Sequence, residues 1–566
     1  MAHDLDSLQV FGVQGKPCAI SRRSFLALSA VAAISSLVGC SSQGAASQTS
    51  SAASSADLAE IGETVFPNTV AENATISSEY ADAAKELTES AFEYFRQIAK
   101  IPRKSEHLEG ISSYIEQFAT DYDYALTKDD AGNICFDVPA SSGYESYPKV
   151  ILQAHMDMVV STSEDNTSFD PLTDAIHLVE TEDVFKSDGT TNIGSDDGEG
   201  LCTLLAIAAA DSSVFAHGPL RFMFTCDEDI GLVGASAMDS VLLDSDYLVN
   251  VDADYVGKVI YGAAGAMAGK FTQDCVPSVV DSDMTVLSVE VSGLAGGHSS
   301  LHATDTLLGA NSVMRESMNA VASVDEGWRL LELTGGEIKN AIPNAASMRL
   351  CVSFDKAAEV KAKIEEAFQQ QLAGYPKDAD AKLIVSEDSA ADNTEALSIE
   401  DTQNVRDLFN SLADGTIDSS FENQASCNIS PVNITGGHVE LNALFRAAKN
   451  ETMKNAKDDW QSVAAKYAFD YSTEMDFPAW EQSADDSFVN LFCDELASVC
   501  AIKGKKERSA GGLEPSIFAQ KRPGMQMVSI GADTEGEHVI SETLYKKSFP
   551  VHMAVLMAAL QDVDKL

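Results

Sequence analysis

Short apolar runs alternate with polar turns through the first half of the chain. Residues 150–152, 220–224 and 247–251 are each rich in β-branched or aromatic side chains and end at polar residues. Such runs are typical of buried strands. A longer apolar run at 200–208 predicts a buried helix between the first two strands. Because strands that alternate with helices form parallel sheets, the pattern predicts an α/β fold with a mostly parallel sheet and helices on both faces.

Histidine and carboxylate side chains occur where these predicted strands end, and one more stands just before the helix. In chain order, with one histidine near the C-terminus, the candidate ligands are His155, Asp196, Asp229, Asp252 and His538. Each motif alone is weak; the Ser-Asp-Asp-Gly at 195–198, for example, is also a common helix start. Ligands of parallel sheets bind beyond the carboxyl ends of the strands. The set therefore predicts a two-metal hydrolase, since cations accept these ligand types and can share a bridging carboxylate.

From about Phe92 to the C-terminus, the chain resembles the aminoacyl-histidine dipeptidase (Xaa-His dipeptidase) family of co-catalytic zinc metallopeptidases. The motifs that carry the resemblance are IPRKSEH, LQAHMDMVV, TTNIGSDDGEG, TCDEDIGLVGA, VNVDAD, GLAGGHSSLH, GGEIKNAIPN, AGGLEP and VSIGADTEGEHVISE. The resemblance implies hydrolysis of the peptide bond of dipeptides with two divalent cations. Zinc fits these nitrogen and oxygen ligands, and manganese or cobalt would fit them too.

The resemblance also implies how the ligands divide between the two cations. Asp196 would bridge them. Asp229 and His538 would complete one site, and His155 and Asp252 would complete the other.

Further residues match catalytic and substrate-binding positions of that family. Asp157 would hold the first imidazole ligand in its ligating tautomer, and Glu228 would be the general base. His298 would stabilise the oxyanion of the tetrahedral intermediate. Asn340 and Arg446 match positions suited to the substrate carboxylate, which a guanidinium binds through two hydrogen bonds.

Several positions depart from the family pattern. Asp229 stands where the family usually has Glu, and Ala510 stands where it has His. Glu535 and Asn344 each replace an Arg. These changes leave the hydrolytic chemistry in place, but they put a preference for His-containing dipeptides in doubt.

The N-terminus has the features of an exported lipoprotein. Arg22 and Arg23 form a twin-arginine motif, an apolar run follows at 25–38, and Cys40 ends a lipobox. The run is shorter than the roughly 20 residues that span a bilayer. We expect a signal peptide at 1–39 and a lipidated cysteine with a flexible tether at 40–84. The protein would then be anchored by lipid on the outer side of the cytoplasmic membrane.

The remaining chain is expected to form two domains. Asp252 and His538 can share a cleft only if the residues between them loop out. The predicted catalytic domain therefore has two segments, 85–266 and 477–566, and an α+β lid domain is inserted at 267–476. Of the 10 cysteines, eight remain beyond Cys18 and Cys40, and they show no C-x-x-C pair. This pattern favours free thiols over a zinc ribbon or a disulfide framework.

Charge and site together leave three functions open. A net charge of −49 disfavours nucleic-acid binding. The preferred interpretation is a metallopeptidase acting on short peptides. The same site would also suit an N-acyl amino acid deacylase or a carboxypeptidase, and a catalytically silent peptide-binding lipoprotein is the third alternative. The sequence leaves a homodimer open.

Overall fold

The computed structural model describes residues 59–60, 70–163, 166, 168–299, 307–388, 393–420 and 422–566. The predicted signal peptide, Cys40 and the tether up to residue 58 lie outside these residues. From Val70 onward the chain is packed: this side chain is buried, and the N–H groups of Thr75 and Ser77 donate to the carbonyls of Cys500 and Val499. The tether was expected to extend to residue 84, so the packed chain begins earlier than predicted.

Nine strands among the described residues form a sheet with a parallel centre. In order across the sheet they are β2 (Leu126–Lys128), β3 (Ile134–Val138), β7 (Leu220–Thr225), β4 (Val150–His155), β8 (Tyr247–Val251), β26 (Gln526–Ile530), β9 (Lys258–Ala263) and β23 (Trp480–Glu481), with β25 (Lys505–Ser509) also beside β9. Strands β7, β4, β8 and β26 are parallel, whereas β2 and β3 are antiparallel. The carboxyl ends of the parallel strands therefore meet at one edge of the sheet.

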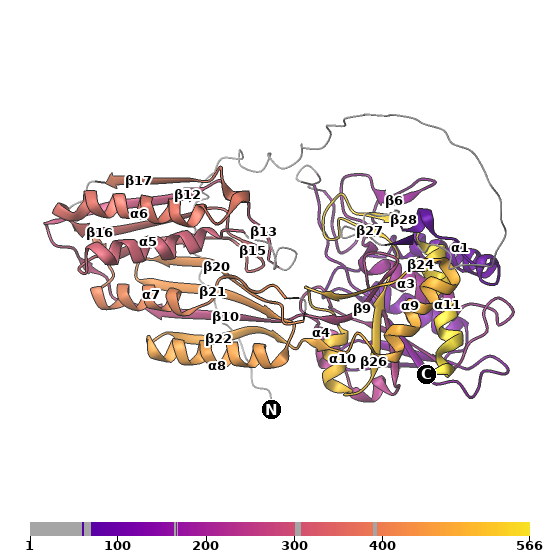
Figure 1. The fold of residues 1–566 in the computed structure, drawn as a ribbon. Coiled ribbons are helices and arrows are strands. Elements are labelled where there is room, and N and C mark those ends of the chain that lie inside the picture. The colour runs from indigo at the N-terminus through magenta and orange to yellow at the C-terminus, as the bar shows by residue number, and fades with distance from the viewer. Residues whose placement is uncertain are drawn as a thin grey trace, which may run out of the picture. The chain divides into compact units, whose positions relative to one another are not determined.

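Side chains of the central strands point alternately into two hydrophobic clusters, as the two-residue repeat of a strand requires. In β4, Leu152 belongs to one cluster and Ile151 to the other. The first cluster is covered by α1 (Ala81–Ile98), α2 (Glu109–Asp121), α3 (Ser195–Ala208), α9 (Ser487–Cys500) and α11 (Phe549–Asp562), and the second by α4 (Val233–Ala237) and α10 (Pro515–Lys521). The predicted α/β fold with helices on both faces is confirmed (Figure 1).

A second sheet is formed by the chain between β9 and β23. Its nine strands within the described residues are β10 (Gly265–Asp274), β12 (Met284–Ser292), β14 (Arg329–Gly335), β16 (Ala346–Ser353), β17 (Lys382–Asp388), β19 (Gly415–Asp418), β20 (Ala425–Thr435), β21 (His438–Ala447) and β22 (Asp470–Phe477). All neighbouring strands are antiparallel. The helices of this part are α5 (Ala310–Val324), α6 (Ala357–Leu372), α7 (Ile399–Ser411) and α8 (Asn450–Lys466) (Figure 1). We call residues 265–477 the lid domain; a lid was predicted at 267–476.

A small four-stranded sheet places His538, the predicted C-terminal ligand. It consists of β5 (Leu178–Glu180), β6 (Val184–Ser187), β27 (Thr534–Glu535) and β28 (Thr543–Tyr545). His538 lies in the connection between β27 and β28, with a positive φ of 64°. This sheet ties the C-terminal segment to residues that precede α3.

The eight cysteines within the described residues are free thiols, and six of them are buried. No helix in the described part of the chain is long and apolar enough to cross a membrane.

Candidate metal centre and substrate cleft

The five predicted ligands converge because the fold ends their elements at one place. His155 is the last residue of β4, and Asp252 directly follows β8. Asp229 follows β7, and Asp196 is the second residue of α3. His538 reaches the same place from the small sheet.

The carboxylate of Asp196 lies between two imidazoles. Its Oδ1 is 2.9 Å from Nε2 of His155, and its Oδ2 is 2.9 Å from Nε2 of His538. Asp252 Oδ1 lies 3.8 Å from the first of these nitrogens, and Asp229 Oδ1 lies 3.0 Å from the second. Two ligand triads therefore share Asp196, and the ligand atoms within each triad lie within 4.8 Å of one another.

The chemistry of this cluster fits divalent cations. Burial, together with the charge of neighbouring carboxylates, raises the pKa of Asp252 well above its usual range. Hydrogen bonds to Asp196 and Asp229 raise the pKa of His538 to about 11. The buried Oδ2 of Asp229 has no hydrogen-bond partner within the described structure. Packed carboxylates repel one another and a buried oxygen needs a partner, and cations bound in the two triads would meet both requirements.

Asp157 connects the first triad to the predicted general base. Its Oδ1 lies 3.4 Å from His155 Nδ1 and accepts from the N–H of Glu228 at 3.0 Å. Its Oδ2 accepts from the N–H of Asp229 at 3.2 Å and from Ser105 Oγ at 2.8 Å. Burial alone would raise the pKa of Asp157, but the hydrogen bonds from His155, Glu228 and Ser105 outweigh it and lower the pKa. Asp157 thus orients the imidazole and fixes the loop that carries Glu228.

Arg103 is a buried residue of the site to which the sequence analysis gave no role. Its Nη1 donates to the carbonyls of Met156, at 3.1 Å, and Asp157, at 2.5 Å, and its Nη2 donates to the carbonyl of Gly194. Burial lowers its pKa, and the nearby carboxylate of Asp197 opposes that shift. Arg103 therefore joins the backbone after β4 to the backbone before α3. It lies in the IPRKSEH motif, and the presence of arginine in a motif was the only sequence signal available.

Glu542 is a second residue that the sequence analysis did not assign. One carboxylate oxygen accepts from the N–H groups of Ile193 and Gly194, both at 2.7 Å, and the other accepts from the N–H of Ser195 at 2.8 Å and its Oγ at 2.6 Å. The side chain is fully buried, and burial raises its pKa. Glu542 therefore fixes the backbone that presents Asp196. It closes the EHVISE motif, four residues after His538.

Replacing Glu542 by glutamine is expected to lower the free energy of unfolding by about 2–4 kcal/mol, because an amide NH₂ would then face backbone N–H donors that have lost their acceptor. A urea titration followed by circular dichroism measures the change. The matched control is Glu535→Gln, an exposed side chain that accepts a hydrogen bond from Tyr545 Oη, where a change within about 0.5 kcal/mol is expected. Equal stability of both variants would show that Glu542 does not support the Asp196 loop.

Four of the five predicted ligands, Asp196, Asp229, Asp252 and His538, line a cleft of about 830 Å³. Glu228 lines it together with Asp196, and the lid domain contributes His298 and Arg446. Asn340 is not part of the lining; its Nδ2 lies 3.3 Å from His298 Nε2 instead. The cleft therefore brings the predicted base, the lid histidine and the predicted carboxylate-binding arginine to the same space as these predicted ligands.

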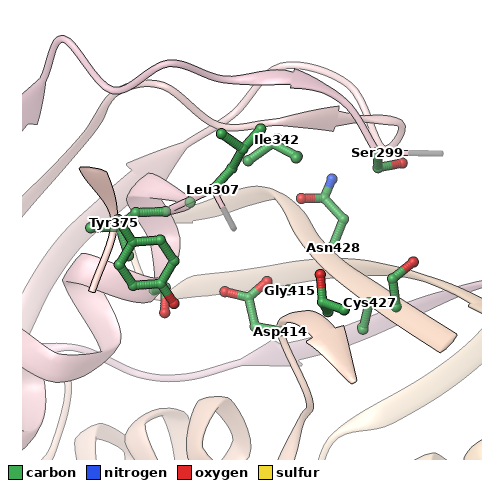
Figure 2. Close-up of a pocket in the computed structure, with 13 residues that line it drawn as sticks. Ser299, Leu307, Ile342, Tyr375, Asp414, Gly415, Cys427 and Asn428 are labelled. Atoms are coloured by element: carbon green, nitrogen blue, oxygen red, sulfur yellow. The ribbon is translucent and has the colours of Figure 1, made fainter. Parts of the chain in front are cut away.

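The loop that carries Asn340 is held by a neighbouring strand of the lid. Asn428 of β20 donates its Nδ2 to the carbonyls of Lys339 and Ala341, both at 2.8 Å. The N–H of Ser299 donates to the carbonyl of Asn340 at 2.8 Å, beside the short pairing of β13 (Gly297–His298) with β15 (Ala341–Ile342). Figure 2 shows the amide of Asn428 directed toward Ile342. Both residues line a small cavity of about 30 Å³.

Comparison with known proteins finds one matching peptidase family and relatives that are dipeptidases. The model of Peptidase family M20/M25/M40 matches residues 151–562. The cytosol non-specific dipeptidase of Escherichia coli (strain K12) is 27% identical over 476 residues, which cover 83% of this chain and 97% of that protein. The crystal structure of aminoacylhistidine dipeptidase from Vibrio alginolyticus has a TM-score of 0.75 at 25% identity, covering 83% of this chain and 96% of that one. These relatives bear out the resemblance that the sequence motifs carry.

Proposed function

Since the chain belongs to Peptidase family M20/M25/M40, and is thereby a metal-dependent hydrolase, we propose that it is a dipeptidase that cuts short, unblocked peptides. One observation carries the proposal: the Asp196 carboxylate lies 2.9 Å from the imidazoles of both His155 and His538, in a cleft that Glu228 also lines. The two relatives described above are both dipeptidases, which supports the same choice of bond.

Two cations, zinc in the first place, would be held by the two triads that share Asp196. When bound, they would polarise the scissile carbonyl and lower the pKa of a water molecule toward neutrality. The residues of the chain supply the rest of the chemistry. Asp157 keeps the His155 ring oriented through its Nδ1, and Glu542 and Arg103 keep the Asp196 loop in place.

Glu228 would move the proton of the reaction. Its backbone is fixed by Asp157, and its side chain lines the cleft beside Asp196 and Asp229. In this role a carboxylate oxygen accepts a proton from the attacking water and then donates it to the nitrogen of the leaving amine. The proton balance closes, because the amine leaves with the proton that the water lost.

Two lid residues would bind the substrate on the opposite side of the cleft. A ring nitrogen of His298 would donate to the oxyanion as it forms, and Asn340 would orient that ring from 3.3 Å. Arg446 is largely buried, and burial lowers its pKa to about 10. Among the described residues, its Nε has no hydrogen-bond partner, and no neighbouring carboxylate contributes to the shift of its pKa. A peptide carboxylate would supply the missing partner.

Asn428 should support catalysis through the His298 loop. Replacing it by alanine removes both hydrogen bonds to the 339–341 backbone, so we expect kcat to fall by about tenfold with little change in KM. If the loss of kcat acts through the histidine, it will disappear when Asn428→Ala is made in a His298→Ala background. Asn311→Ala is the matched control, since this equally buried lid asparagine binds the carbonyls of Gly335 and Ile429 instead. Equal losses of kcat in both asparagine variants would mean a general effect on folding.

A substrate panel separates the proposed activity from its alternatives. The metal-loaded protein without its first 58 residues is incubated with dipeptides, N-acyl amino acids and longer peptides, and released amino acids are quantified. Release from unblocked dipeptides alone supports the proposal. Release from N-acyl amino acids would favour a deacylase, and stepwise release from the C-terminus of longer peptides would favour a carboxypeptidase. Binding of dipeptides without release, with zinc or manganese present, would favour a silent binding protein.

We also propose export by the twin-arginine route and anchoring through lipid on Cys40. The support is the order of Arg22-Arg23, apolar run and lipobox in the sequence. Mass spectrometry of the N-terminal peptide from a membrane fraction should find an acylated Cys40. A Cys40→Ser variant should appear in the soluble fraction, and Arg22→Lys with Arg23→Lys should stop export. An unprocessed N-terminus in the native host would contradict the proposal.

A further inference from the structure

We propose that the cleft selects peptides whose C-terminal residue carries an apolar side chain. The inference rests on the proposed dipeptidase function and concerns the wall of the cleft that the lid domain supplies.

Strand register places the carboxylate-binding arginine and an aromatic ring in one row of the lid sheet. Ala266 of β10 pairs with Arg446 on one neighbouring strand and with Phe477 on the other. Paired residues of antiparallel strands point to the same face, and two strand spacings separate the outer two Cα atoms by about 10 Å. A guanidinium and a phenyl ring therefore stand on the same face with only a methyl group between them.

The next row and the facing loops extend this apolar surface. Ala268 pairs with Met475, and both line the cleft. Leu513 and Ile260 continue the lining beside Phe477. We call these five side chains the apolar wall.

A glycine lets the neighbouring segment approach the ring. A Cβ atom at Gly512 would collide with the ring of Phe477, so the backbone of the AGGLEP segment lies directly against the wall. Ile230 and Val233, on the segment after Asp229, also line the cleft and are 50% and 44% exposed. Large apolar side chains left exposed in a cleft indicate a binding surface for an apolar group.

Charges beside the apolar wall are already paired. Glu474 forms an ion pair with Lys339, and Asp476 forms one with Lys457. Arg446 is the cleft-lining cation of this sheet face without such a partner in the described residues. A charged side chain placed on the wall would lose its hydration without gaining a partner, whereas an apolar one would gain by leaving water.

The position of the arginine decides which substrate residue meets the wall. If the peptide carboxylate binds Arg446, the C-terminal Cα is one bond away from that carboxylate. The side chain on this Cα is then the one that reaches across Ala266 and Ala268 toward Met475 and Phe477. The N-terminal residue lies on the other side of the scissile bond, nearer the triads.

A paired dipeptide panel tests the inference. Ala-Xaa and Xaa-Ala series, with Xaa as Gly, Asp, Lys, His, Leu, Met or Phe, are compared by kcat/KM on the metal-loaded protein. In the Ala-Xaa series, Leu, Met and Phe should exceed Gly, Asp and Lys by about 10- to 100-fold, and His should fall below Leu. A flat Ala-Xaa series, or a preference confined to the Xaa-Ala series, would overturn the proposal.

The wall itself is tested with two matched methionine variants. Met475→Ser should reduce the Ala-Leu to Ala-Gly ratio by about fivefold or more. Met284→Ser should leave it unchanged, because Met284 is also a half-buried lid methionine but packs against a cluster away from the cleft. Equal ratios in both variants would remove Met475 and the wall from specificity.

The same dipeptides are also titrated into the Glu228→Gln variant by calorimetry. If the wild-type protein hydrolyses none of them, the proposed function fails, whereas their order of binding still supports or contradicts the apolar wall. The failure of one inference is thus distinguishable from the failure of the other.

Discussion

The Glu228→Gln variant is expected to lose about 10³-fold in kcat while its metal content stays the same. Glutamine keeps the size of the side chain and the backbone N–H bond to Asp157, but it cannot accept a proton from water. General acid–base groups typically contribute 10²- to 10⁴-fold, and here one carboxylate would serve in both directions of proton transfer. Steady-state kinetics on dipeptides, with elemental analysis of the same preparation, measures both quantities.

The control for this result is Glu474→Gln, which changes another carboxylate that lines the cleft. Glu474 forms an ion pair with Lys339 and takes part in no step of the proposed reaction. The kcat of the Glu474→Gln variant should therefore stay within a few-fold of the wild-type value. Normal turnover in Glu228→Gln would remove this residue from the mechanism. Loss of metal from the variant would instead assign Glu228 a ligand role.

The second large effect is expected for Asp196→Ala, which should lose both metal equivalents and all measurable turnover. Its two carboxylate oxygens each lie 2.9 Å from the imidazole of a different triad, so one substitution removes a ligand from both. Without the bridging carboxylate, each triad keeps only one imidazole and one carboxylate.

Asp254→Asn provides the comparison, since Asp254 lines the same cleft but belongs to neither triad. Two equivalents should remain bound in that variant. If Asp196→Ala retained one equivalent with full affinity, the carboxylate would not bridge the two sites. If it retained both, the proposed centre would be wrong.

Much of the fold and of the ligand set could be predicted because the signals are local. The apolar run of β4 and the histidine that ends it lie within a few residues, and the topology of a parallel sheet then sets where such ends meet. Two assumptions are enough to predict that the five ligands meet: the carboxyl ends of the parallel strands lie at one edge of the sheet, and one domain is inserted between Asp252 and His538. The two triads that the structure assembles use these five side chains.

Other features depend on contacts that no local pattern records. Glu542 binds backbone N–H groups nearly 350 residues earlier in the chain, and Arg103 binds carbonyl groups rather than side chains. A backbone partner does not depend on residue type, so the motifs that contain Glu542 and Arg103 do not indicate these two roles. The sequence also does not show that the packed chain begins at Val70, because the first packed residues bind backbone carbonyls of Val499 and Cys500, more than 400 residues later.

The apolar wall of the lid domain could not be predicted from the sequence either. Arg446 and Phe477 stand in one row only because both flank Ala266 in register. A shift of one residue would turn either side chain to the opposite face of the sheet. The sequence offered Arg446 as a carboxylate ligand, but it could not show what lies beside it.

Anomalous diffraction from crystals grown with zinc would show whether two cations bind in the two triads that share Asp196. Two anomalous peaks are expected, one on each side of the Asp196 carboxylate: the first beside His155 and Asp252, and the second beside Asp229 and His538. A cleft that shows no peak at saturating zinc, or peaks remote from these five side chains, would contradict it.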